Sequence, residues 1–225
     1  SSIDNPIYTR RGSQCTLSAQ FTPPYSLFSK KDYKSLYESS SRADREELYR
    51  WIEYYKIKFK SRVYTPLNNS EKYTLVLMGR ADFGLLGSYN KYKQTPFETF
   101  HVGGDGMTGS YTYATETIGL RGYDNGALTP YSDGRAYTRF SMELHFPFLL
   151  QPSSTIYGLA FVEGGNAWTS LENFNPFSLK RSAGVGVRIF LPMIGLMGID
   201  WAYGFDKVQG EKGGGHFHFI LGQEF

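Results

Sequence analysis

YKIKFKSRV, residues 55–63, places apolar and cationic side chains at alternate positions. Successive side chains of a β-strand point to opposite faces of a sheet, so one face of this strand is apolar and the other is cationic. A packed core would not accept such a row of charges, whereas the wall of a water-filled barrel keeps each of them hydrated. A solvated face of a soluble sheet is the simpler alternative. The pattern favours a barrel wall whose lumen cations are Lys56, Lys58, Lys60 and Arg62.

The same alternation recurs along the chain and predicts about eight strands. The segments are residues 15–21, 55–63, 73–83, 139–146, 155–168, 183–190, 194–203 and 215–225. Most connections between them are alternately long and short, which is typical of outer-membrane barrels with long extracellular loops and short periplasmic turns. The predicted fold class is therefore all-β, an antiparallel transmembrane β-barrel. We expect function in the longest connection, residues 87–135, and a solvated loop over residues 22–49.

The composition agrees with a strand-rich chain and excludes several kinds of site. Of 225 residues, 17% are aromatic and 25 are glycines, which favours strands joined by glycine-rich turns. The net charge of +3 is spread along the chain, so no nucleic acid partner is expected. The single Cys15 excludes an internal disulfide framework and a cysteine-rich metal site. No metal site, cofactor or catalytic residue is predicted.

No segment has the length of a spanning helix. The longest apolar run, residues 190–199, has about half the length that such a helix needs. The mean hydropathy of −0.39 does not decide the question, because a barrel wall alternates apolar and polar residues. The N-terminus has no basic segment followed by an apolar core, so an export signal would have to lie upstream. The chain is therefore expected to be a fragment of a longer protein.

Two motifs lie in the longest connection and in a later strand. IGLRGYDNG, residues 118–126, resembles the V-R-G-F/Y motif of the superfamily that includes BamA, TamA and the two-partner-secretion proteins. FVEGG, residues 161–165, resembles its F-x-D-x-G motif, with Glu in place of Asp. The resemblance implies that the loop folds back into the barrel and that its arginine docks on this carboxylate, which receives the fork of donors. The expected loop-to-wall lock comprises Leu120, Arg121, Gly122, Tyr123 and Glu163.

The C-terminus, GGGHFHFILGQEF at residues 213–225, alternates apolar residues and ends on an aromatic one. It is similar to the β-signal by which outer-membrane proteins are recognised for assembly, and to the last strand of the same superfamily. Gly222 matches a glycine that kinks this strand, and glycine there weakens ladder pairing. DNPIYTRRGS, residues 4–13, resembles the segment before a mid-barrel strand. The expected last-strand seam and β-signal residues are Gly215, Phe217, Phe219, Leu221, Gly222 and Phe225.

The resemblance covers nearly the whole chain and implies that residues 1–225 are the C-terminal half of a sixteen-stranded barrel, a domain of the bacterial surface antigen type. It implies a non-enzymatic role in the bacterial outer membrane, where nascent β-barrel proteins are assembled and inserted through a lateral seam. The implied partners are outer-membrane lipids, nascent β-barrel proteins and accessory assembly lipoproteins. POTRA domains and the N-terminal half of the barrel would precede this chain.

Three other interpretations stay open at this point. A secretion pore of the same superfamily would use the cationic face as its path, and ion conductance with a secreted partner would identify it. A small barrel enzyme would use His145, His216 or His218 with a carboxylate, but no G-x-S-x-G or H-E-x-x-H motif is present. A closed barrel of eight strands is geometrically sufficient, and its mass in detergent would identify it. The C-terminal ending favours assembly over secretion, and the loop of nearly fifty residues argues against a closed eight-stranded barrel, whose narrow lumen is already filled by side chains.

Overall fold

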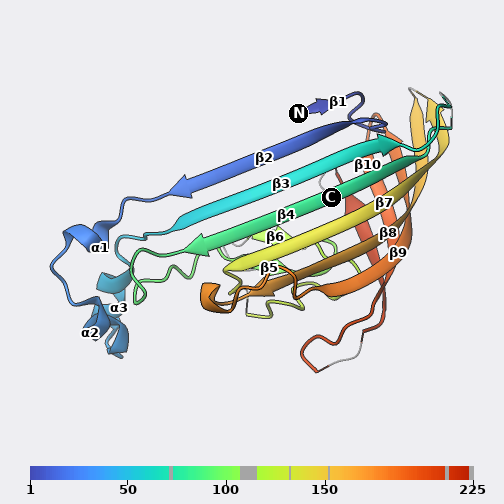
Figure 1. Ribbon diagram of the computed structural model, residues 1–225. Coiled ribbons are helices and arrows are strands. Elements are labelled where there is room, and N and C mark those ends of the chain that lie inside the picture. The colour runs from blue at the N-terminus through green and yellow to red at the C-terminus, as the bar shows by residue number, and fades with distance from the viewer. Residues whose placement is uncertain (71–72, 107–115, 132, 152, 211–212, 223–225) are drawn as a thin grey trace.

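A nine-stranded antiparallel sheet forms the body of the protein (Figure 1). The computed structural model describes residues 1–225 except 71–72, 107–115, 132, 152, 211–212 and 223–225. Neighbouring strands are hydrogen-bonded in the order β1-β2-β3-β4-β7-β8-β9-β10-β11. Their bounds are Ser2–Ile3 (β1), Gly12–Phe21 (β2), Tyr55–Pro66 (β3), Val76–Gly87 (β4), Ala136–Gln151 (β7), Ser154–Trp168 (β8), Lys180–Leu191 (β9), Gly195–Gly204 (β10) and Gly215–Leu221 (β11).

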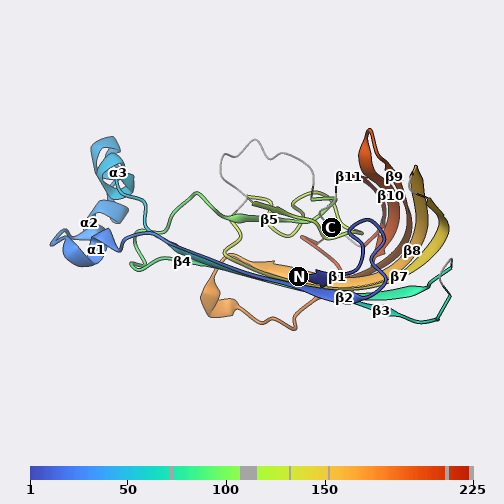
Figure 2. The ribbon, with the colours of Figure 1, turned by 90° about the horizontal axis from the view of Figure 1, so that it is seen from above.

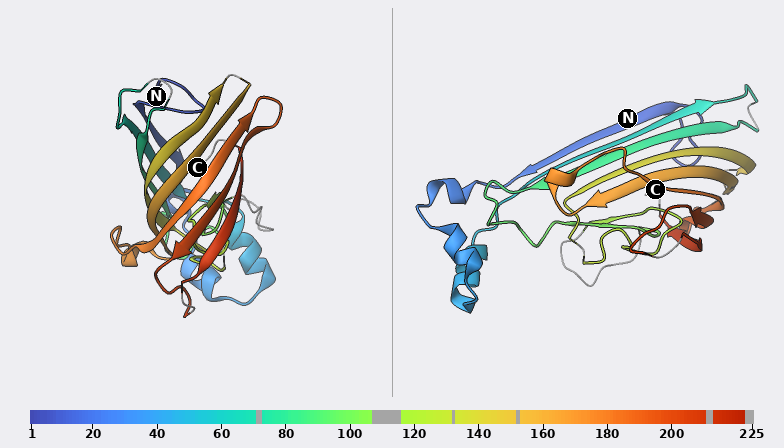
Figure 3. Two further views of the ribbon diagram at one scale, coloured as in Figure 1. Left: turned by 90° about the vertical axis from the view of Figure 1, so that its right-hand side faces the viewer. Right: turned by 60° about the horizontal axis from the view of Figure 1, so that its bottom comes forward.

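The eight longer strands correspond one to one to the eight predicted segments, which confirms the interpretation of the alternation. The sheet curls into a deep trough, as Figure 2 and the left view of Figure 3 show. In the part of the chain that is described, β11 pairs only with β10, and β1 and β2 lie at the opposite edge. The sheet is thus not closed, and the interpretation of this chain as a closed eight-stranded barrel is wrong.

The two faces of the sheet have the polarity expected of a membrane barrel wall. The ladder register aligns Lys60 with Asp82 and Asp82 with Arg139, so these side chains share the concave face. Apolar residues on the convex face, such as Leu17, Met142 and Phe217, are more than half exposed. Because charged groups are buried inside and large apolar groups are exposed outside, the convex face suits lipid rather than water.

The long connection between β4 and β7 lies over the concave face. It contains β5 (Phe100–Val102) and β6 (Glu116–Ile118), which pair in parallel with each other (Figure 1). The ring of Phe100 packs edge-on against Tyr137 of β7, with 4.7 Å between ring centroids. Further apolar side chains join this contact, so the loop is anchored by a small core: Leu86, Phe100, Val102, Ile118 and Tyr137.

The connection between β2 and β3, expected to be an irregular solvated loop, instead holds three short helices. They are α1 (Tyr25–Phe28), α2 (Tyr33–Glu38) and α3 (Arg42–Tyr49), and they project beyond the ends of β2 and β3 (Figures 1 and 3). Asp32 caps α2 by accepting hydrogen bonds from the backbone N–H groups of Lys34 and Ser35. Ser41 stands at the N-cap of α3, but its side chain makes no capping hydrogen bond.

The N-terminal segment folds into the other end of the trough. Tyr8 packs edge-on against Tyr157 at 5.2 Å between ring centroids, and its hydroxyl donates to the carbonyl of Thr74. Asp4 holds the bend, because its Oδ1 accepts from the backbone N–H groups of Arg10 and Arg11.

Within the described residues, no helix is long and apolar enough to cross a membrane.

Candidate functional site

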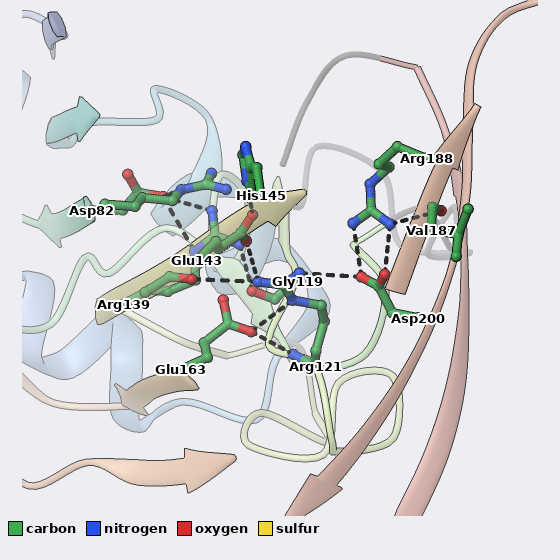
Figure 4. Close-up of polar contacts among 12 residues, drawn as sticks. Asp82, Gly119, Arg121, Arg139, Glu143, His145, Glu163, Val187, Arg188 and Asp200 are labelled. Carbon is green, nitrogen blue, oxygen red and sulfur yellow. Dashed lines mark hydrogen bonds and ion pairs between the residues drawn. The ribbon is translucent and has the colours of Figure 1, made fainter. Parts of the chain in front are cut away.

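The side chain of Arg121 is the centre of the contact between the long loop and the sheet (Figure 4). Its Nε donates to Glu163 of β8 at 3.2 Å, its Nη2 to Glu143 of β7 at 2.5 Å and its Nη1 to Asp200 of β10 at 3.1 Å. Its backbone N–H also donates to Glu163, at 3.0 Å. The four side chains are between 0% and 7% exposed. One loop residue therefore ties three strands together through shielded, charge-assisted hydrogen bonds.

Two further arginines, Arg188 and Arg139, bind carboxylates close to this residue. Arg188 of β9 donates from Nη1 and Nη2 to the two oxygens of Asp200, at 2.5 and 2.8 Å. Arg139 of β7 donates to Asp82 at 2.6 Å and to the loop carbonyl of Gly119 at 2.6 Å. The guanidinium carbon of Arg121 also lies 3.5 Å from the centroid of the Phe161 ring. The loop backbone is thus fixed on both sides of the motif.

The residues that follow Arg121 bring the loop backbone against the last strands. Gly122 has φ +86°, and a Cβ there would lie 2.8 Å from Ser182 Cβ and 3.0 Å from Gly204 N. Its N–H donates to Nε2 of His218 at 2.9 Å. The hydroxyl of Tyr123 donates to the carbonyl of Arg181 at 2.6 Å. Any residue with a Cβ at position 122 would push the loop away from these strands.

The structure brings together all five residues of the expected lock. Leu120 is fully buried and lies over the backbone of Gly165, where an added Cβ would stand 2.9 Å from Leu120 Cδ1. The sequence alone missed Glu143, Asp200 and His218 as partners of the motif. Each of them occupies an inward position of an alternating strand, which is the only signal that the sequence offers for them.

The cationic face of β3 differs from its expected state. The side chain of Lys56 is 3% exposed and its Nζ lies 3.2 Å from Glu98 and 3.1 Å from Glu116 of the long loop. Lys58 pairs with Glu116 at 2.9 Å. The expectation that each cation stays hydrated is wrong for Lys56, because the loop covers it and supplies two carboxylates. Lys60 and Arg62 line, with Lys58 and polar residues of β2, a pocket of about 250 Å³.

The last strand presents the expected alternation. Phe217, Phe219 and Leu221 are 71%, 60% and 65% exposed on the convex face. Gly215 is the first residue of β11 and pairs with Tyr203 of β10. Gly222 follows the strand with φ +103° and open space where a Cβ would stand. Phe225 lies outside the described residues.

The inward histidines His145 and His216 contact carboxylates of the sheet and of the loop. Nε2 of His145 lies 2.9 Å from one oxygen of Glu143, and Arg121 holds the other oxygen. Nδ1 of His216 lies 3.1 Å from the carboxylate of Asp124. Glu143 is thus already engaged at both oxygens by groups of this chain, which leaves little capacity for general-base work.

Comparisons with known proteins agree with this geometry. A family model described as the Omp85 superfamily domain matches residues 1–225. A solved structure of BamA from Haemophilus ducreyi lacking POTRA domains 1–3 is similar over 98% of this chain, with a TM-score of 0.63 and 18% sequence identity. This chain spans 41% of that BamA chain, and at this identity the likeness shows the fold. Omp85 proteins are outer-membrane β-barrels with transport or assembly roles that are generally non-enzymatic. The chain belongs to the Omp85 superfamily.

Proposed function

We propose that this chain is the C-terminal part of a barrel that assembles and inserts other β-barrel proteins into the bacterial outer membrane. Nascent β-barrel proteins are its substrates, outer-membrane lipids surround it, and accessory lipoproteins assist it. The N-terminal half of the barrel and POTRA domains complete it. The 41% coverage of the BamA chain supports a part of a larger barrel.

The state of the last strand carries this proposal. β11 comprises seven described residues, compared with sixteen in β7, and its only described neighbour in the sheet is β10. In the complete barrel the strand on the other side of β11 would come from the missing N-terminal half, and a short last strand gives a short seam there, whose opening exposes the backbone N–H and C=O groups that strand addition requires. The convex side chains of β11 are apolar and suit lipid, so an incoming strand would be added at membrane depth.

The loop contacts support assembly over secretion. A secretion path would need cations that are free to line it, but Glu98 and Glu116 of the inward loop neutralise Lys56, and Glu116 also pairs with Lys58. The loop also covers the concave face through the contacts of Arg121. In this proposal the loop braces the wall while the last strand exchanges partners.

The test replaces Gly222 by Val in the complete protein and measures assembly of a reporter barrel in cells depleted of the native copy. Valine at φ +103° strains the bend after β11, so we expect assembly to fall. Gly210, in the connection between β10 and β11, provides the matched control, because it has φ +87° and equally open space. G210V carries comparable backbone strain at the opposite end of β11 from Gly222. Equal assembly with G222V and G210V would count against the proposal.

A further inference from the structure

The last strand is held on its concave side by the loop, as well as by β10. Three side chains of β11 point inward: His216, His218 and Ile220. His216 contacts Asp124, and His218 accepts the N–H of Gly122. Both contacts are made to loop residues within three positions after Arg121. The loop is therefore a bridge between the locked wall and the edge strand.

The two histidine contacts differ in shielding. The side chains of His216 and Asp124 are 27% and 78% exposed, so water competes for both groups. His218 is 4% exposed, and its bond to Gly122 is buried. A buried N–H that loses its acceptor is costly, whereas an exposed pair is replaced by water. The retention of β11 by the loop therefore rests mainly on His218.

The direction of this hydrogen bond fixes the chemistry of the ring. A backbone N–H can only donate, so Nε2 of His218 must carry its lone pair and the proton must be on Nδ1. The ring acts as an acceptor that projects a fixed distance from the strand. A glutamine presents its amide oxygen at a similar reach, whereas an asparagine is one methylene shorter.

We propose that His218 is a positioning residue that couples the Arg121 lock to the last strand, and that loss of its acceptor releases β11 from β10 while the lock stays closed. The inference rests on the proposed function, because release of β11 is the step that exposes the template edge. It assigns the control of that step to one neutral histidine. Arg121 keeps its contacts to Glu143, Glu163 and Asp200, none of which passes through His218.

The experiment compares H218Q and H218N in the complete protein, reconstituted in lipid nanodiscs, by hydrogen exchange of backbone amides. These variants share the same functional group and differ in reach. We expect β11 amides in H218N to exchange about tenfold faster than in H218Q, because the buried N–H of Gly122 then lacks an acceptor. Exchange at residues 118–121 of the loop should be unchanged in both variants. H216Q, which alters the exposed contact of the same face, should change β11 exchange little.

Equal exchange of β11 in H218Q and H218N would overturn the proposal, since an acceptor of the right reach would then make no difference. Faster exchange at residues 118–121 together with β11 would also overturn it, because the lock would open with the strand. H218L, which keeps apolar bulk, provides a third variant and should behave as H218N does. The exchange readout needs no client protein, so a failure of the assembly role with G222V leaves this result independent.

Discussion

Replacement of Arg121 by methionine tests the lock at its centre. The substitution keeps much of the side chain's bulk but removes the cation from among three carboxylates that are at most 7% exposed. Asp200 retains Arg188, whereas Glu143 keeps only its contact with the His145 ring and Glu163 only the backbone N–H of residue 121, so these two carboxylates lose their arginine. Removing one partner of a buried ion pair costs roughly 3–5 kcal/mol. We expect R121M to lower the free energy of unfolding by about this amount.

A double-mutant cycle separates the charge effect from simple loss of packing. In the wild type, E163Q weakens the contacts of Arg121 and should be destabilising. In the R121M background the same change removes an unpaired buried charge, so it should be stabilising by on the order of 2 kcal/mol. Urea unfolding of the complete barrel in lipid vesicles, followed by tryptophan fluorescence, measures all four proteins. R181M is the control, because Arg181 pairs with Asp206 at the surface and its loss should matter far less.

Two results would refute this account of the lock. One is a cost of R121M below about 1 kcal/mol, which is typical of hydrated surface pairs. The other is an effect of E163Q that has the same sign and size in both backgrounds, because Arg121 and Glu163 would then not be coupled.

Three further predictions follow from particular contacts. G122A should be destabilised more than G210A in thermal unfolding, since both residues have positive φ but only Gly122 lacks room for a Cβ, and equal losses would contradict this packing. F219K should lower the free energy of unfolding by up to about 2–4 kcal/mol in a bilayer, and by much less where no lipid contacts the barrel. Absence of this bilayer-specific cost would contradict a lipid-facing position for Phe219. The side-chain hydrogen bond from Arg181 lowers the pKa of Asp206 to about 2. This contact therefore stabilises the connection between β10 and β11 above the ordinary pKa of an aspartate, and the stabilisation is lost as the pH falls through about 2. Carboxyl NMR of R181Q should show the pKa of Asp206 return upward.

The strands could be predicted from the sequence because period-two alternation is a local property. The order of apolar and cationic residues in 55–63 predicts which side chains lie on each face of the strand, and no other part of the chain is needed for this prediction. The pairing of Arg121 with Glu163 followed from the resemblance of two short motifs. The first loop was misjudged because α2 and α3 are short and charged, and their packing on each other carries no strong periodic signal.

The rest of the site depends on register and curvature, which local patterns do not encode. Glu143 meets Arg121 because β7 and β8 are staggered so that Ser141 faces Glu163. Asp200 reaches the same guanidinium because the sheet curls until β10 faces the loop (Figure 2). Lys56 is neutralised by Glu98 and Glu116 of the loop, which lie 42 and 60 positions further along the chain. No sequence pattern within β3 predicts those partners.

The most direct test of the assembly proposal is disulfide trapping between β11 and the terminal strand of a client barrel during its assembly in cells. Opposed residues of paired strands have Cβ atoms within about 5.5 Å, near the range that a disulfide bridges. Cysteine would be placed at position 217 or 219 in a C15S background, with F83C in the sheet interior as the control. The account predicts client adducts from F217C and F219C and none from F83C. Equal trapping from all three positions, or trapping from none, would contradict the proposal that the last strand is the template.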